Sequence, residues 1–306
     1  GADRPRRGTQ IAPPPLVLSL SKHRAQRWSL RQAQAERSVC VDQFSKSIEA
    51  VMREAAERAI RPRFQALAAH EISEKAADDF VTVADREAEE ILAEGLARLL
   101  PEAAIVAEEA AHADASLLER LSDPLCWIID PLDGTHNFAH GKPPFGVLVA
   151  LAENGVATGG WILDALSGRF CHAFAGQGAF VNGERVHART TGRQPPVAAI
   201  SLLFADAGRR EALKTHIAPH YAVVDIPRCA AEQYPRLVLG ENDVSIFERT
   251  YAWDHGAGVL FVNEAGGKAA RPDGSPYRVD GHFERGLIAA ASPALWDELA
   301  ARMATI

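Results

Sequence analysis

The segment CWIIDPLDGTHNF, residues 126–138, joins a short apolar run to two closely spaced aspartates, Asp130 and Asp133. The apolar run predicts a buried strand that stops at the first acid. Pro131 fixes the backbone between the acids, so we expect both carboxylates to face one small volume, with the Leu132 carbonyl between them. Hard oxygen donors grouped in this way suit a divalent cation.

The residues that follow Asp133 predict an anion site beside that cation. Gly134 permits close backbone approach, and the amides of Gly134 and Thr135 open a helix, where unpaired N–H groups and the helix dipole favour phosphate. A turn and helix cap after a core strand is the commoner interpretation of a lone Asp-Gly-Thr. A haloacid-dehalogenase type of phosphatase is excluded, because its nucleophilic aspartate would fall at Pro131, which cannot attack phosphorus.

The composition is that of an ordinary globular protein, with 306 residues of which 47% are hydrophobic and 24% charged. Residues 1–37 hold eight of the 33 basic residues and two of the 40 acidic ones, which leaves 25 basic against 38 acidic residues in the rest of the chain. We expect this acidic remainder to repel nucleic acid. No apolar run reaches the roughly eighteen residues of a membrane helix, so we expect no membrane span.

The cysteines and the N-terminal residues indicate where the protein resides. We expect free thiols in a reducing, cytoplasmic environment, because no Cys-x-x-Cys pair occurs among Cys40, Cys126, Cys171 and Cys229. Residues 1–40 are interpreted as a flexible tail. A signal peptide is the alternative, but the apolar patch before Ser21 is short.

Apolar residues recur at spacings of three and four in two stretches. The first predicts an amphipathic helix from Val41 to about Ala69. The second predicts a helix that starts within Thr82 to Asp85 and runs to Leu99. Asp85 is either a first-turn acid favoured by the helix dipole or a functional group.

Two adjacent acids, Glu108 and Glu109, follow a short predicted strand at residues 104–107. Neighbouring residues of a strand point to opposite faces. We therefore expect one acid to turn toward the centre while the other faces away or supports it. A solvated acidic loop is the alternative interpretation.

The remaining chain predicts two domains. Turn signals between residues 146 and 186 predict an antiparallel meander. A polar connector at residues 190–196 is the expected boundary between an α+β domain, residues 41–190, and an α/β domain, residues 191–306. In the second domain Asp254 opens a helix, where it is either a helix cap or a site acid.

Three stretches match the signatures of one family. Residues 130–138 fit Asp-Pro-x-Asp-Gly-Thr-x-Asn-Phe at every fixed position, and residues 253–258 fit Trp-Asp-x-x-Ala/Gly-Gly. Residues 108–109 supply both acids of a Gly-Glu-Glu-Ser element, whose flanking Gly and Ser are alanines here. The chain thus resembles the inositol monophosphatase family over residues 42–300.

This resemblance implies a layered αβαβα sandwich of the sugar phosphatase type, with an α+β N-terminal part and an α/β C-terminal part. It also implies a Mg²⁺-dependent phosphomonoesterase that is inhibited by lithium, forms a homodimer and acts on a small phosphorylated metabolite. At matching positions, Glu108, Asp130 and the Leu132 carbonyl would hold one metal. Asp130, Asp133 and Asp254 would hold the other.

The resemblance assigns further roles around the metals. Asp85, acting through Thr135, would orient and help deprotonate the attacking water, with Glu108 close to that water and Glu109 behind it. The amides of Gly134 and Thr135 would bind phosphate. Four carboxylates and a phosphate dianion carry about six negative charges, which two or three Mg²⁺ ions would balance in two-metal phosphoryl chemistry.

Four more residues are candidates near the site. Lys75 resembles a family lysine, and Glu248 resembles an acid that contacts sugar hydroxyls, although each lies one residue closer to the following signature than is usual. His136 and His255 stand beside key acids and could contact metal or substrate. Exposed or structurally hydrogen-bonded histidines are the commoner alternative.

The sequence leaves the substrate open. Inositol monophosphate is the best match to the resemblance, and related members act on histidinol phosphate, fructose 1,6-bisphosphate or 3′-phosphoadenosine 5′-phosphate. A catalytically silent metal-binding or scaffolding protein is the alternative from another class. The presence of every expected metal acid argues against it.

Overall fold

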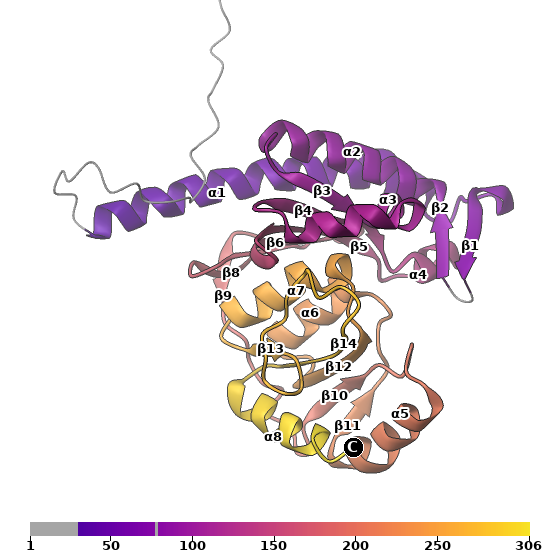
Figure 1. The fold of residues 1–306 in the computed structure, drawn as a ribbon, viewed down its shortest axis with the longest axis vertical. Helices are drawn as coiled ribbons and strands as arrows, with labels where there is room; N and C mark the ends of the chain where they lie inside the picture. Colours follow the sequence, from indigo (N-terminus) through magenta and orange to yellow (C-terminus); the bar gives the residue numbers. More distant parts are fainter. Residues whose placement is uncertain (1–29, 77–78) are drawn as a thin grey trace, which may run out of the picture.

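The computed structural model describes the backbone of residues 30–76 and 79–306, and the side chains from residue 42 onward except residues 69 and 74–79. Helices and sheets alternate in five layers (Figure 1). Helices α1 (Leu30–Ala55) and α2 (Val83–Leu99) cover one face of a seven-stranded sheet. The layered α/β sandwich expected from the sequence is confirmed.

The other layers follow in order below the large sheet (Figure 1). Helices α6 (Ala230–Val238) and α7 (Ala252–Glu264) lie between this sheet and a five-stranded sheet. Helix α8 (Pro293–Met303) and the π turn Leu213–Ile217, which continues α5 (Ala207–Ala212), cover the outer face of the second sheet. Each sheet therefore separates two apolar cores, one on either face.

The seven-stranded sheet has its strands in chain order, β3 to β9. All neighbouring pairs are antiparallel except β3 and β4, which are parallel. The predicted meander is confirmed. The strands are β3 Ala104–Ala107, β4 Cys126–Asp133, β5 Gly146–Glu153, β6 Val156–Asp164, β7 Phe170–Phe174, β8 Gly178–Val181 and β9 Glu184–Val186.

The five-stranded sheet has the order β11-β10-β12-β14-β13. Strand β10 is parallel to β11 and β12, whereas β14 is antiparallel to β12 and β13. Its strands are β10 Val197–Ile200, β11 Ala222–Val224, β12 Val244–Arg249, β13 Lys268–Ala270 and β14 Arg285–Ala290. A small antiparallel pair is formed by β1 Ile72–Ala76 and β2 Asp79–Thr82, and two short helices are α3 Glu108–Ala113 and α4 Thr135–Ala139.

Strand β4 shows why its sequence is apolar without alternation. Trp127 and Ile129 pack against α1 and α2, while Cys126 and Ile128 face the core that contains α6 and α7. A strand covered on both faces buries every side chain, so residues 126–129 are all apolar. The continuous run in the sequence is the signature of this central position.

Two boundaries differ from those expected. Helix α1 begins at Leu30, inside the stretch expected to be a flexible tail, because residues 30–37 are mostly good helix formers. It continues as one π turn and one 3₁₀ turn to Arg63, where Pro62 interrupts the hydrogen-bond pattern. Strand β4 does not stop at Asp130 but extends to Asp133, with a shift of register against β5 between them.

Cys126, Cys171 and Cys229 are buried free thiols, as expected, while the Cys40 side chain lies outside the described residues. Burial raises the pKa of all three described thiols. Among the described helices, none combines the length and apolarity that a membrane span requires.

Helix α7 lies close against strand β6 because glycine stands at the crossing point. A Cβ atom at Gly160 would lie 2.9 Å from both the Cα atom and the carbonyl oxygen of Ala257. These atoms of Ala257 belong to the backbone of α7, and Gly160 belongs to the backbone of β6, so neither can move without its helix or strand. Any side chain at residue 160 must therefore displace the helix.

We expect Gly160→Ala to lower the free energy of unfolding by about 1–3 kcal/mol, the usual cost of an overpacked core. The matched control is Gly208→Ala, since Gly208 lies in a helix and the nearest atom to an added Cβ is 3.4 Å away. Chemical denaturation of the two variants measures the difference. Equal stability of both would contradict the close approach of α7.

Candidate active site

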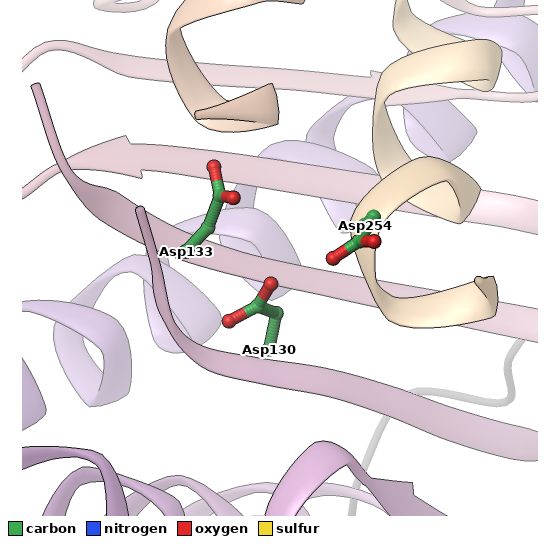
Figure 2. Close-up of side chains that lie close together, drawn as sticks. All are labelled: Asp130, Asp133 and Asp254. Atoms are coloured by element: carbon green, nitrogen blue, oxygen red, sulfur yellow. The ribbon is translucent and has the colours of Figure 1, made fainter. Parts of the chain in front are cut away.

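Three aspartates from distant parts of the chain meet in one cavity. Asp130 and Asp133 lie at the end of β4, and Asp254 lies in the first turn of α7. One carboxylate oxygen from each lies within 4.8 Å of the other two. Figure 2 shows the three side chains directed toward one another. The fold thus brings together acids that are far apart in sequence.

The local backbone explains how the two aspartates of β4 reach the same place. The register of β4 against β5 shifts between Asp130 and Asp133, on either side of Pro131, which has no amide for the ladder. The Leu132 amide instead donates to Asp130 Oδ1 at 3.1 Å. Gly134 then turns the chain with a φ of +83°, a conformation suited to glycine.

The carboxylate of Asp85 connects helix α2 to this turn. Its Oδ2 atom accepts hydrogen bonds from the backbone amide and the hydroxyl of Thr82, at 2.7 and 2.6 Å. Its Oδ1 atom lies 3.0 Å from the Thr135 hydroxyl, which is also 2.7 Å from the Leu132 carbonyl. Asp85 is therefore both part of a capping box and a neighbour of the site, so the two interpretations of this residue are compatible.

Glu108 and Glu109 begin α3 directly after β3. Since β3 is parallel to β4, with Ala107 opposite Ile129, the ends of the two strands lie side by side. Glu108 lines the cavity that contains the three aspartates. Glu109 lines a separate hollow beside α2, so the two neighbouring acids face different spaces, as expected.

Burial and mutual repulsion govern the protonation of these acids. Burial, the largest cause, raises the pKa of Asp85 to about 7 and that of Asp133 to about 6. Burial likewise raises the pKa of Asp254 to about 7, against the opposing effect of the Arg249 cation. The pKa of Asp130 is raised by burial and by the charges of Glu108, Asp133 and Asp254.

This group of carboxylates fits a hard divalent cation. Asp130, Asp133 and Asp254 offer oxygen atoms only, and Leu132 lines the same cavity. Two unit charges about 4 Å apart repel by roughly 4 kcal/mol at an effective dielectric of 20. A bound cation removes this repulsion, and Mg²⁺ prefers such oxygen ligands.

Three contributions to the site were missed in the sequence. Glu89 accepts hydrogen bonds from the amides of Glu109 and Ala110, at 2.8 and 2.9 Å, and so holds the start of α3. Its position four residues after Asp85, on the same helical face, was an available signal. The Ala231 amide donates to Asp133 Oδ2 at 2.6 Å, a contact without any local signal.

The third missed residue, Arg249, places its guanidinium 3.7 Å from a carboxylate oxygen of Asp254.

The two weaker candidates, Lys75 and Glu248, are less directly placed. Lys75 lies in β1, with its side chain outside the described residues. Glu248 lines the cavity but forms an ion pair with Arg209 of α5 at 3.0 Å.

The two histidines differ. Both ring nitrogens of His255 are engaged, one with the Tyr234 hydroxyl at 2.6 Å and one with the Arg249 carbonyl at 3.0 Å. Burial lowers the pKa of His255 to about 3, so it is neutral and structural. His136 lines the cavity and stacks on His140, with the ring centroids 4.4 Å apart.

Comparison with known proteins identifies a family. The sequence model of the inositol monophosphatase family matches residues 41–306. The chain is 33% identical over 234 residues to an inositol-1-monophosphatase of Mycobacterium leprae, a match that covers 74% of this chain and 78% of the relative. It is 30% identical over 189 residues to a fructose-1,6-bisphosphatase/inositol-1-monophosphatase of Thermotoga maritima, covering 62% of this chain and 70% of the relative.

The fold is likewise similar to solved structures. A Thermotoga maritima IMPase superimposes with a TM-score of 0.72 at 25% sequence identity, covering 86% of this chain and 97% of the other.

The raised pKa values predict that the metal-free protein loses stability as pH rises. In the unfolded chain the aspartates ionise near their ordinary pKa of about 3.9, whereas Asp85, Asp133 and Asp254 hold protons to about pH 6–7 when folded. Between these values the folded state binds more protons, so its stability falls from pH 4 to pH 7.

Without divalent cations, we expect the protein to unfold at a lower temperature at pH 8 than at pH 5. The free energy of unfolding should fall by about a few kcal/mol between these pH values, because one pKa unit corresponds to about 1.4 kcal/mol. Added Mg²⁺ should restore stability at pH 8. Asp254→Asn should show a smaller dependence on pH. Unfolding temperatures that rise from pH 5 to pH 8 without metal would contradict the repulsion.

Glu89→Gln should weaken the attachment of α3. A glutamine side chain can accept only one of the two amide hydrogen bonds and faces the other amide with its own N–H, at a cost of about 1–3 kcal/mol. Calorimetry of unfolding with and without Mg²⁺ tests this, and the Mg²⁺-induced rise in unfolding temperature should shrink. Glu90→Gln is the control, because Glu90 is the exposed next residue of the same helix.

Proposed function

This chain belongs to the inositol monophosphatase family, and on this premise we propose that it hydrolyses a small phosphorylated polyol in a Mg²⁺-dependent reaction. It is a phosphoric monoester hydrolase of a metal-dependent family that acts on small phosphorylated metabolites. The observation that carries the proposal is the meeting of Asp130, Asp133 and Asp254 within 4.8 Å, beside Thr135.

The family resemblance suggests the roles of the acids. Glu108, Asp130 and the Leu132 carbonyl would hold one Mg²⁺, and Asp130, Asp133 and Asp254 would hold another, so that Asp130 bridges the two. Bound Mg²⁺ supplies a nucleophilic water of lowered pKa and neutralises charge on the phosphoryl group. Two or three ions would balance the four carboxylates and the phosphate.

The protein groups around the metals orient the water and receive its proton. The Thr135 hydroxyl lies 3.0 Å from Asp85 Oδ1, so a water beside Thr135 can pass a proton toward that carboxylate. Glu108 approaches the same space from α3, and Glu109 supports it from behind. The amides of Gly134 and Thr135 would bind the phosphate oxygens.

Inositol monophosphate is the proposed substrate. The two relatives described above carry different substrates in their names, inositol monophosphate for one and also fructose 1,6-bisphosphate for the other. Histidinol phosphate and 3′-phosphoadenosine 5′-phosphate are further alternatives. We also propose a division into parts 41–190 and 191–306, because the seven-stranded sheet ends at Val186 and the five-stranded sheet begins at Val197.

Three further properties remain predictions from the sequence: the protein is cytoplasmic, it forms a homodimer, and it binds no nucleic acid. Both Lys75 and Glu248 remain candidate substrate contacts. Inhibition by lithium is expected as well. A catalytically silent metal-binding or scaffolding protein is the competing interpretation.

Release of inorganic phosphate from inositol 1-phosphate tests the proposal directly. We expect turnover with Mg²⁺, none with a chelator, and inhibition by Li⁺. The absence of Mg²⁺-dependent release from a panel of phosphorylated metabolites would favour the silent interpretation.

Asp130→Asn tests the bridging role. We expect turnover to fall by more than about 100-fold, since even residues that only support metal ligands contribute about 10- to 100-fold. The fold should persist, because the substitution removes a repelling charge. Asp42→Asn, at an exposed position of α1, is the control for turnover and unfolding. Near-normal turnover of Asp130→Asn would refute the role.

A further inference from the structure

One wall of the cavity is apolar and differs from the acidic end that would hold metal and phosphate. It is formed by the loop after β10, the loop before α6 and strand β12, and its described members are Leu203, Phe204, Ile226, Pro227 and Phe247. Since the acids and Thr135 occupy the other end, the leaving group of the substrate would lie beside this wall. A hydroxyl buried there loses its hydrogen bonds to water without gaining a partner, so the wall favours an apolar surface on the leaving group.

Phe204 is the part of this wall that a ligand can reach most easily. It is 45% exposed, whereas the other described residues that line the cavity are buried or partly buried. Single exposed apolar residues are common on protein surfaces. Phe204, however, stands in the cavity that contains the site acids, so its exposed ring borders the space for the substrate.

The backbone holds Phe204 in an unusual conformation. Its φ of +62° lies in the left-handed region, which a residue with a bulky side chain rarely adopts. Two arginines fix this turn. Arg210 Nε donates to the Leu202 carbonyl at 3.1 Å. Arg285 Nη1 donates to the Phe204 carbonyl at 3.0 Å. A strained residue that its surroundings hold in place, at the edge of a cavity, indicates a functional position.

A single guanidinium connects the ring of Phe204 to the site acids. The guanidinium carbon of Arg249 lies 3.9 Å from the ring centroid of Phe204 and 4.6 Å from that of Tyr251. The same guanidinium forms the ion pair with Asp254 at 3.7 Å. The charge of Arg249 is therefore matched within the protein, and the group acts as a mount for the ring. It covers one face of the ring and leaves the opposite face and the edge for a ligand.

We infer that Phe204 is a specificity-determining residue that stacks on the face of a cyclic leaving group. That face can be an aromatic base, or the C–H face of a cyclic polyol whose hydroxyls project mainly from the ring edge. An acyclic polyol has no face free of hydroxyls, so some of them would lose their hydration against the apolar wall. This inference rests on the proposed phosphatase function and narrows its substrate class.

Three phosphomonoesters that differ in the shape of the leaving group test the inference. Inositol 1-phosphate carries a cyclic polyol, adenosine 2′-monophosphate carries a sugar with an aromatic base, and glycerol 2-phosphate carries an acyclic polyol. All three are esters of secondary alcohols, so their leaving groups are chemically similar. With Mg²⁺, we expect kcat/KM of the better cyclic substrate to exceed that of glycerol 2-phosphate by at least tenfold.

Variants of Phe204 then assign the preference to the ring. Phe204→Leu should lower the ratio of kcat/KM for cyclic over acyclic substrates by at least fivefold, mainly through KM of the cyclic ones. Phe204→Gly, which also relieves the positive φ, should lose the preference as well. Phe204→Tyr keeps the ring and should retain the ratio. The matched control is Phe283→Leu, since Phe283 is 74% exposed and outside the described cavity lining. It should leave the ratio unchanged.

The outcomes separate the two proposals. A wild-type protein that favours neither cyclic substrate would overturn the role of Phe204 while the phosphatase function stands. So would an unchanged ratio in Phe204→Leu, including an equal loss of turnover for all substrates through Arg249 and Asp254. A loss that includes inositol 1-phosphate would identify the C–H face as the ligand, and a loss confined to adenosine 2′-monophosphate would identify the base. No Mg²⁺-dependent release from any substrate would overturn both proposals.

Discussion

Repulsion among buried carboxylates is the constraint on which this structure depends. Asp130, Asp133 and Asp254 converge from β4 and α7, and Glu108 lines the same cavity. In water such groups would separate, but two sheets and their helices hold the backbones in place. The fold therefore holds an unfavourable arrangement of charge that a divalent cation relieves. Because the ligands are already in place, metal binding does not have to pay the entropy of ordering them.

The five layers explain how that arrangement is held. Strand β4 is buried on both faces, and its final residues carry the first two aspartates. Helix α7 crosses β6 at Gly160 with backbone contact, which brings Asp254 to the same end of the sheet. On the other side, the Ala231 amide fixes Asp133. Each acid thus depends on packing between layers and not on its own loop.

The same layers give the cavity a second, basic side. Strand β12 turns Arg249 toward Asp254, while Glu248, which also lines the cavity, forms an ion pair with Arg209 of α5. A slip of one residue exchanges the faces of a strand.

The sequence by itself determined the signature around Asp130 and Asp133 and the meander, because these depend on local spacing and on turn signals. The layered class followed from the family resemblance that the signature carries. It could not determine that β4 continues past Asp130, since the resumed pairing depends on β5. Only the tertiary structure decided the contacts of Glu89 and of the Ala231 amide, and the side to which Glu248 turns. Such contacts join segments far apart in the chain, and no local preference of the backbone specifies them.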